Sequence, residues 1–291
     1  MDFAQQLVNG VQIGSVYALV AIGYTMVYGI AKMINFAHGD IIMVGSYVAL
    51  LFFQSSGLPV WGVIAATAAV SAALGVTIER LAYKPLRGGS RMSALITTIG
   101  VSLMLQNGFL LIFGSSPKPF PNHFTGEGFT LGGVTVSRLT AITLVVTVVL
   151  MVLLTLFVNR TRVGKAMRAV SEDQGAAQLM GINIDTSISI TFAIGSALAA
   201  VAAVLYSSTY PLINPYMGSM LGLRAFIAAV IGGIGVIPGA MIGGFIIGIA
   251  EALIKRYISS AMADAIVFAL LIIVLLVKPS GLLGRNEREK V

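Results

Sequence analysis

The sequence predicts an all-α fold, a polytopic bundle of transmembrane helices that forms a single domain over residues 1–291. Hydrophobic residues make up 57% of the chain and charged residues only 10%, where a soluble domain has about 25% charged residues. Apolar runs of membrane-crossing length also recur along the whole chain. The chain has no cysteine, which excludes disulfides and cysteine-ligated metal sites.

Nine segments are predicted to cross the membrane, because each approaches the roughly 20 apolar residues that a helix needs to span a bilayer. Their approximate ranges are 7–30, 36–54, 60–83, 93–113, 138–158, 187–209, 221–237, 240–256 and 259–277. His38 and Asp40 interrupt the second range, and glycine clusters shorten the seventh and eighth. We therefore expect about eight or nine spans, some of them broken or re-entrant.

Small residues repeat every four positions in two of these ranges, a pattern that lets helix backbones approach closely in lipid. The repeats are Gly10, Gly14 and Ala18 in the first range and Ala240, Gly244, Gly248 and Ala252 in the eighth. By contrast, residues 139–158 carry neither a charge nor such a repeat, and they are predicted to face lipid. The sixth range is rich in small residues from Phe192 onward, which predicts a tightly packed core helix.

The distribution of Lys and Arg predicts the orientation, because cytoplasmic loops are enriched in these residues. If the polar segment 160–186 is cytoplasmic, the inner side receives Lys32, Arg80, Lys84, Arg87, Arg91, Arg160, Arg162, Lys165, Arg168, Lys278, Arg285, Arg288 and Lys290. The outer side receives Lys118, Arg138, Arg224, Lys255 and Arg256. The N-terminus is then outside and the C-terminus cytoplasmic. The external loop 114–137 is rich in Pro and Gly, which favours turns.

The polar segment 160–186 is predicted to be a docking loop for another protein. Ser171 to Gln174 matches a capping box with Ser171 as the N-cap, and Gly181 supplies a left-handed stop. The helix between these signals, residues 172–180, is too short to be stable alone in water. We therefore expect a partner surface to hold it.

The predicted docking helix has an apolar face, since Ala176, Leu179 and Met180 lie at spacings of three and four. Such a face suits a groove on another protein, although a surface helix in the headgroup region fits the same spacing equally well. The residues expected to form the docking contact are Ser171, Glu172, Asp173, Gln174, Ala176, Ala177, Leu179, Met180, Gly181 and Ile182.

Polar groups and helix breaks at membrane depth mark candidate positions on a translocation path, because both are costly in lipid. The candidates are Asn35, His38, Gln106, Asn107, Gly232, Gly233, Gly235 and Glu251. Glu251 is predicted to point into the bundle, where a carboxylate satisfied by a neighbouring helix, or by water near the outer face, is favoured over a gating role. Gln106 and Asn107 fit hydrogen bonds between helices as well as they fit a pore.

Two further patterns leave alternatives open. His38 and Asp40 are two residues apart and diverge on a helix, so residues 35–40 fit a cytoplasmic turn or helix break better than a proton-relay dyad. The glycines and the proline of residues 232–239 predict either a turn between half-helices near the translocation path or a tight hairpin at the membrane surface.

No energy source is visible in the sequence. Gly164 and Lys165 are followed by Ala166 and lack the upstream glycine of a phosphate-binding loop. The pattern H-E-x-x-H is also absent. We expect no metal and no cofactor on this chain, so an ATPase that drives it would be a separate chain.

Several stretches resemble a known family. Gly175-Ala176-Ala177-Gln178-Leu179-Met180-Gly181 resembles the coupling motif E-A-A-x-x-x-G of ABC importer permeases, with Gly at the acidic position. GSVYALVAIGYTMVYGIAKMINFAHGD from Gly14, ERLAYKPLRG from Glu79 and AAVIGGIGVIPGAMIGGFIIGIAEAL from Ala228 are similar to the LivH-type permeases of branched-chain amino acid importers. The resemblance runs nearly from end to end.

The resemblance implies a non-enzymatic permease subunit in the bacterial inner membrane, with residues 172–182 as the helix that couples it to ATPases. It also implies a homologous second permease subunit, two ATPase subunits that carry ATP and Mg²⁺, and a periplasmic or lipid-anchored protein that delivers leucine, isoleucine or valine. The alternative is a secondary carrier or channel that works without ATP. That alternative predicts paired charges at mid-membrane, whereas the ionisable residues here fall mostly at span ends.

Overall fold

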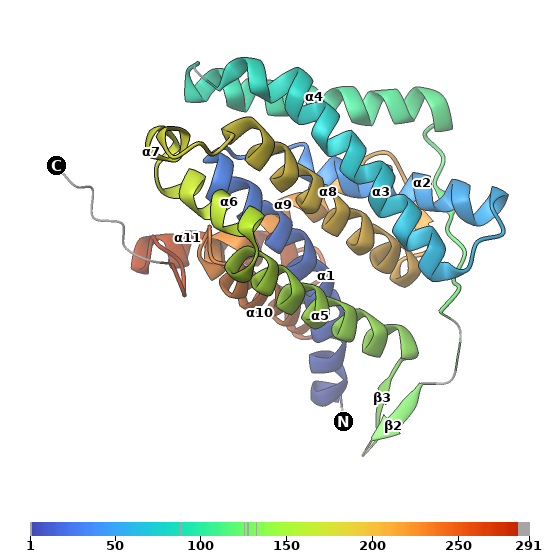
Figure 1. Ribbon diagram of the computed structural model, residues 1–291. Coiled ribbons are helices and arrows are strands. Elements are labelled where there is room, and N and C mark those ends of the chain that lie inside the picture. Colours follow the sequence, from blue (N-terminus) through green and yellow to red (C-terminus); the bar gives the residue numbers. More distant parts are fainter. Residues whose placement is uncertain (1, 88, 125, 127, 132, 285–291) are drawn as a thin grey trace.

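The structure is a computed structural model that describes residues 2–87, 89–124, 126, 128–131 and 133–284. Its α-helices are α1 (Asp2–Ala31), α2 (His38–Ser55), α3 (Val60–Ile78), α4 (Arg91–Phe113), α5 (Arg138–Arg160), α6 (Arg162–Glu172), α7 (Gln174–Leu179), α8 (Ile184–Thr209), α9 (Met217–Gly232), α10 (Ile237–Tyr257) and α11 (Ala263–Val277) (Figure 1). A π-helical turn η1 (Glu79–Tyr83) and a 3-10 turn η2 (Lys84–Leu86) continue α3.

Every predicted span is helical, as α1 to α5 and α8 to α11, so the all-helical fold is confirmed. Six helices of the described chain are long and apolar enough to cross a membrane, namely α1, α3 with its continuation, α4, α5, α8 and α10. The remaining three are shorter or interrupted. α9 and α11 have 16 and 15 residues, and α2 begins inside the bundle.

α1 and α8 form the core of the bundle. In their most apolar stretches 83% and 72% of the residues are buried, against 17% in α5. α1 contacts α10, α8, α9 and α5, and Figure 1 shows it passing between these helices. The packed-core prediction for the sixth span is therefore confirmed, and α5 lies on the outside of the bundle, where a lipid-facing helix belongs.

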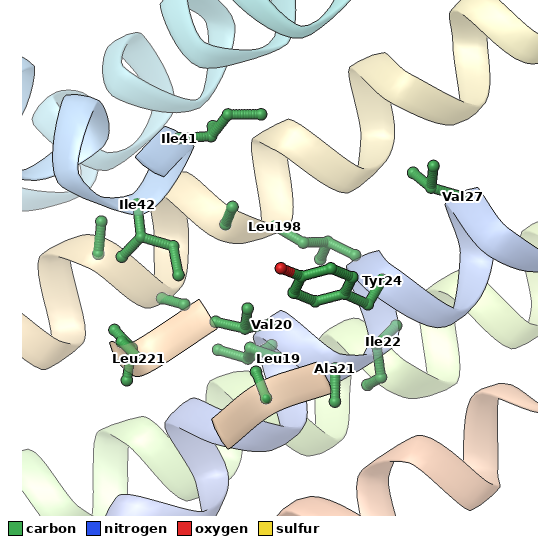
Figure 2. Packing of buried hydrophobic residues seen from close by; sticks show 14 of the residues in the cluster. Leu19, Val20, Ala21, Ile22, Tyr24, Val27, Ile41, Ile42, Leu198 and Leu221 are labelled. Carbon is green, nitrogen blue, oxygen red and sulfur yellow. The ribbon is translucent and has the colours of Figure 1, made fainter. Parts of the chain in front are cut away.

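The centre of the bundle is filled by apolar side chains from four helices. Figure 2 shows Leu19, Val20, Ala21, Ile22, Tyr24 and Val27 of α1 packed with Ile41 and Ile42 of α2, Leu198 of α8 and Leu221 of α9. Nearly all of these side chains are fully buried. The helix that supplies most of them, α1, is thus surrounded by protein along its middle.

The two predicted small-residue repeats face each other across the α1–α10 contact. A Cβ atom added to Gly248 would lie 2.3 Å from the Cα of Gly14, and one added to Gly244 would lie 2.5 Å from the Cα of Ala18. Toward the N-terminal end, a Cβ on Gly10 would lie 2.6 Å from the Cα of Ile249. The backbones of α1 and α10 are in direct contact, which confirms the predicted packing.

α2 starts deep in the bundle rather than at its surface. The ring of His38 lies 4.6 Å from that of Tyr24, which is seven residues, or about 10 Å along the helix axis, before the end of α1. Gly39 packs against Gly218 in the first turn of α9. Of the prediction made for residues 35–40, the helix break is confirmed, since the chain is not helical between α1 and α2, whereas the cytoplasmic position is wrong, because the chain after α1 turns back into the protein.

The two ends of the bundle differ. At one end, β2 (Phe129–Leu131) and β3 (Val134–Val136) form a hairpin, and Gln5 exchanges two hydrogen bonds with the backbone of Thr135. At the same end, β1 (Lys118–Pro119) pairs with β4 (Leu212–Ile213). The turns expected in the loop 114–137 are thus short β-pairs.

The other end carries α6, α7, η2 and the segment that follows α11 (Figure 1). The N-terminal end of α1 and the last described residues therefore lie on opposite faces, as the charge distribution requires. Arg285, Arg288 and Lys290, which contributed to that distribution, lie outside the described residues.

We predict that Gly248→Ala destabilises the protein, because its methyl group cannot fit against the α1 backbone, and overpacking costs about 1–3 kcal/mol. Gly108→Ala in α4 is the matched control, since a Cβ there meets nothing within 4 Å. The measurement is the thermal unfolding midpoint in detergent. Equal midpoints for the two variants would show that the α1–α10 contact does not limit stability.

Candidate functional site

The docking helix α7 begins at a different residue from the one predicted. Asp173 is its N-cap, with Oδ1 accepting from the backbone N–H of Ala176 at 2.9 Å. Ser171 instead belongs to the last turn of α6, where its hydroxyl donates to the carbonyl of Arg168 at 2.7 Å. The predicted capping box is therefore wrong, because the preceding segment is itself a helix that runs to Glu172.

The predicted end of the docking helix is confirmed. Gly181 has φ +80°, and its N–H donates to the carbonyl of Gln178 at 3.0 Å. The next N–H, of Ile182, donates to the carbonyl of Ala177 at 3.0 Å. This pair of bonds is a Schellman motif, which needs a residue that tolerates the left-handed region.

The apolar face of α7 is bare. Leu179 is 90% exposed and Met180 82% exposed, and Ala176 is exposed as well. Ala177 is the exception among the predicted docking residues, since it is 3% exposed and packs inward. The more polar members of the predicted set, Glu172, Asp173 and Gln174, are exposed, and Ile182 is half-buried. The helix thus presents two large apolar side chains to the outside while one small side chain anchors it.

The chain leaving α7 is tied to the end of α3. Asp185, in the first turn of α8, pairs with Lys84 at 2.7 Å and with Arg87 at 2.5 Å. Arg87 also pairs with the fully buried Glu79 of η1, whose Oε2 accepts from the Ser189 hydroxyl at 2.6 Å. We refer to these five residues as the Glu79 cluster.

The Glu79 cluster was missed by the sequence analysis. The stretch ERLAYKPLRG was singled out only for its resemblance, because nothing local pairs Arg87 with a carboxylate far along the chain. Its position matters for the docking loop. It joins the π-helical turn η1, a kind of distortion frequently found at functional sites, to the helix that directly follows α7.

Three of the polar path candidates are buried in the middle of the bundle but have different partners. The Tyr83 hydroxyl donates to Asn35 Oδ1 at 2.7 Å. Gln106 Nε2 donates to Asp40 Oδ1 at 3.0 Å and to the Ser219 hydroxyl at 2.8 Å. His38 is 1% exposed and packs edge-on against a tyrosine ring. These side chains fix α2 to η1, α4, α9 and α1.

Asn107 lies apart from these residues. Its side chain is exposed on α4, and its Nδ2 donates to the carbonyl of Leu103 at 2.8 Å. Only 22% of the apolar stretch of α4 is buried, so Asn107 lies on a surface that lipid or another subunit would cover. The structure therefore separates Gln106, which faces α2 and α9, from Asn107, which is exposed.

Glu251 points into the bundle, as predicted, and neighbouring helices satisfy its carboxylate. The Tyr17 hydroxyl donates to its Oε2 at 2.6 Å, and Arg224 Nη1 donates to its Oε1 at 2.9 Å. Lys255 also binds Oε1, and Arg224 reaches on to Asp264 at 2.5 Å. This Glu251 cluster joins α1, α9, α10 and α11.

The Glu251 cluster corrects the predicted position of one cation. Arg224 is expected in an external loop, yet its side chain is only 15% exposed and binds the buried Glu251. Lys255 also binds Glu251, but it lies in the last turn of α10 and is partly exposed. Arg224 sits inside the bundle because it lies in the middle of α9, whose first turn is already below the surface.

The glycines at residues 232–235 form a tight turn between α9 and α10. Gly233 and Gly235 have φ values of +107° and +94°, and Gly235 packs against Gly29 near the end of α1. The C-terminal segment closes over the turn, with the N–H of Leu283 donating to the carbonyl of Gly232 at 3.0 Å. The turn lies near the end of α1 and follows the short helix α9, so it has features of both predicted alternatives.

These features define a class of protein. The described residues hold no group of three or more histidine and acidic side chains able to bind a metal ion. They form instead a bundle with six helices long and apolar enough to cross a membrane, and the short, exposed helix α7 lies at one end. The arrangement is that of a multi-pass membrane protein.

The comparisons identify the family. Residues 6–275 match the family model described as "Branched-chain amino acid transport system / permease component", and the chain belongs to this family. It is 49% identical to the high-affinity branched-chain amino acid transport system permease protein LivH of Escherichia coli K12. It is 48% identical to the corresponding permease protein BraD of Pseudomonas aeruginosa. Both alignments cover 99% of this chain and 98% of the relative.

A solved structure also matches, described as PsaBC from Streptococcus pneumoniae in complex with Fab. The TM-score is 0.48 at 16% identity, over 96% of this chain and 93% of that chain. A likeness of this degree carries no argument about function. Membership of the family nevertheless makes the chain a multi-pass membrane permease of a transport system.

We predict that Arg224→Met destabilises the protein by about 3–5 kcal/mol, because it leaves Glu251 buried with Lys255 as its only cation. The double variant Arg224→Met/Glu251→Leu is expected to recover much of this loss, since no uncompensated charge remains. Lys255→Met is the control, with a cost below about 1 kcal/mol at a partly exposed site. Unfolding in mixed micelles measures all three, and a double variant no more stable than Arg224→Met alone would contradict the coupling.

Proposed function

We propose that the chain is a permease subunit of an ABC importer and forms part of the membrane pathway for leucine, isoleucine and valine. The observation that carries the proposal is near-full-length identity of 49% to a permease named for high-affinity branched-chain amino acid transport. The subunit is not itself an enzyme. Separate ATPase subunits, which bind ATP and Mg²⁺, supply the energy.

The permease lies in the bacterial inner membrane with its N-terminus outside and its C-terminus in the cytoplasm. Support comes from the basic residues Lys84 and Arg87, which share one face with α6 and α7, since cytoplasmic faces are enriched in Lys and Arg. The position of Arg224 inside the bundle strengthens this orientation, because it removes one cation from the outer loops.

Three kinds of partner follow from this arrangement. Two ATPase subunits bind at the face of α7, and a periplasmic or lipid-anchored binding protein docks at the opposite face, which carries the loop 114–137. A homologous second permease subunit covers part of the poorly buried helices α3, α4 and α5. These helices have 28%, 22% and 17% of their apolar stretches buried, so they leave large surfaces for a second subunit and for lipid.

The docking helix is built to transmit force. It is capped at both ends by Asp173 and Gly181 and anchored by Ala177, so it can move as a rigid unit. Leu179 and Met180 project from it and fit an apolar groove on the ATPase. Closure of the ATPases on ATP would then displace α7 without first having to order it.

The displacement would reach the core through α8. Asn183 caps this helix by accepting from the N–H of Thr186, only two residues after Gly181. The Glu79 cluster binds the start of α8 to the end of α3, so both helices would shift together. The packed helices have two stable arrangements, and this shift moves the bundle from the inward-open to the outward-open one.

The alternative function is that of a carrier that works without ATP. A carrier of this kind is expected to have paired charges inside the membrane, and the buried Arg224–Glu251 pair fits that expectation. Tyr17, Lys255 and Asp264 saturate this pair, so it reads better as a link between helices than as an ion-binding site. Reconstitution separates the two functions directly.

We predict that the permease in liposomes takes up labelled leucine only when the second permease subunit, the ATPase subunits, the binding protein and ATP are all present. Omitting ATP serves as the control within the same vesicles. Leucine uptake by the permease alone, driven by an ion gradient, would refute the importer proposal in favour of a carrier.

We predict that Leu179→Glu lowers ATP-driven uptake at least about tenfold, because a charge in an apolar groove costs more than 1.4 kcal/mol. The abundance of the protein in the membrane should stay normal, since the side chain touches little of its own chain. Lys165→Glu on α6 is the matched control on the same face.

Gly181→Pro should also abolish uptake, because proline cannot adopt the φ of +80° found at this position. Normal uptake by both Leu179→Glu and Gly181→Pro would refute the docking assignment.

A further inference from the structure

A cavity of about 630 Å³ opens between α3 with its η1 continuation and the first turns of α8. None of the functions assigned above uses it. Arg80 and Lys84 line one side, and Asp185, Thr186 and Ser189 line the other. The cavity therefore lies at the end of the bundle that carries the docking helix.

The cavity carries a net positive charge. Lys84 and Arg87 share Asp185, and Arg87 also pairs with Glu79. Within the part of the chain that the structure describes, Arg80 has no such partner, although it lines the same space. The charged residues of the lining are thus two cations and one carboxylate, and the unneutralised guanidinium of Arg80 is free to bind an anion.

Apart from Asn183, the remaining wall of the cavity is apolar. Val76, Ile190 and Ala193 line it on the side that leads into the membrane. A small soluble anion gains nothing from such a wall, whereas a molecule with a phosphate at one end and an acyl chain at the other matches both parts of the site.

We propose that this cavity binds an anionic phospholipid from the cytoplasmic leaflet. The phosphate lies against Arg80 and Lys84, the Thr186 hydroxyl offers a further hydrogen bond, and an acyl chain runs along Val76 and Ile190. Basic pockets between transmembrane helices on the cytoplasmic side have this chemistry. The proposal rests on the proposed orientation of the permease and is independent of the transported substrate.

The position of the site gives the lipid a mechanical role. The headgroup contacts both the η1–η2 segment and the first turn of α8, which is the connection that the Glu79 cluster also makes. Thr186 is four residues beyond Ile182, the last residue of the docking motif. A bound lipid therefore strengthens the joint that carries movement from α7 into the core.

We test the site on the permease purified with its partner subunits in neutral detergent, with bound lipid counted by native mass spectrometry. Dioleoyl phosphatidylglycerol is expected to bind more tightly than dioleoyl phosphatidylcholine. Arg80→Gln is expected to weaken phosphatidylglycerol binding about fivefold, the contribution of one cation near a lipid surface, and to leave phosphatidylcholine binding unchanged. Lys165→Gln, an exposed cation on α6 outside the cavity, should bind phosphatidylglycerol like the parent protein.

Three outcomes would overturn the proposal. The first is equal phosphatidylglycerol binding by Arg80→Gln and the parent protein. The second is displacement of the lipid by millimolar inorganic phosphate, which would assign the cavity to a soluble anion. The third is cross-linking of an Arg80→Cys variant to a partner subunit, which would show that protein covers the cavity. The chain has no cysteine, so the introduced thiol would be its only one. Because the readout is bound lipid, failure of leucine transport would leave the result intact.

Discussion

Contact between the backbones of α1 and α10 is the interaction on which the rest of the bundle depends. Lipid tails are as apolar as leucine, so helices in a bilayer gain little by packing large apolar side chains together. Gly14 and Gly248 remove the side chains altogether, which brings many atoms of the two helices into van der Waals contact. With α1 fixed in this way, α8 and α9 can pack against its other faces.

Buried polar clusters then set how the remaining helices sit on this pair. The Glu251 cluster joins α9, α10 and α11 to α1, the Gln106–Asp40 bond joins α4 to α2, and the Glu79 cluster joins α3 to α8. Each bond is directional and costly to leave unmade in a low-dielectric interior. The glycine contact therefore brings the α1 and α10 backbones close together, and the polar clusters fix the relative positions of the other helices.

Movement and rigidity are assigned to different parts of the fold. The docking helix has one buried residue, Ala177, so it rests lightly on the bundle, while α8 beyond it is packed on several sides. A weakly held element that leads directly into a rigid one is suited to carrying an external push inward. The Glu79 cluster and the cavity beside it lie where these two elements meet, so this joint governs how the two respond together.

The sequence by itself determined the features that depend on neighbours along the chain or on composition. These are the helical membrane bundle, the small-residue repeats, the left-handed stop at Gly181 and the inward direction of Glu251. Tertiary structure alone decided that Asp173 rather than Ser171 caps α7, because burial of Met167 and Val170 extends α6 through Ser171. It also decided that Arg224 lies inside the bundle and that Arg87 meets Asp185. Such pairings join residues far apart in the chain, and their free energy exists only once the helices have packed.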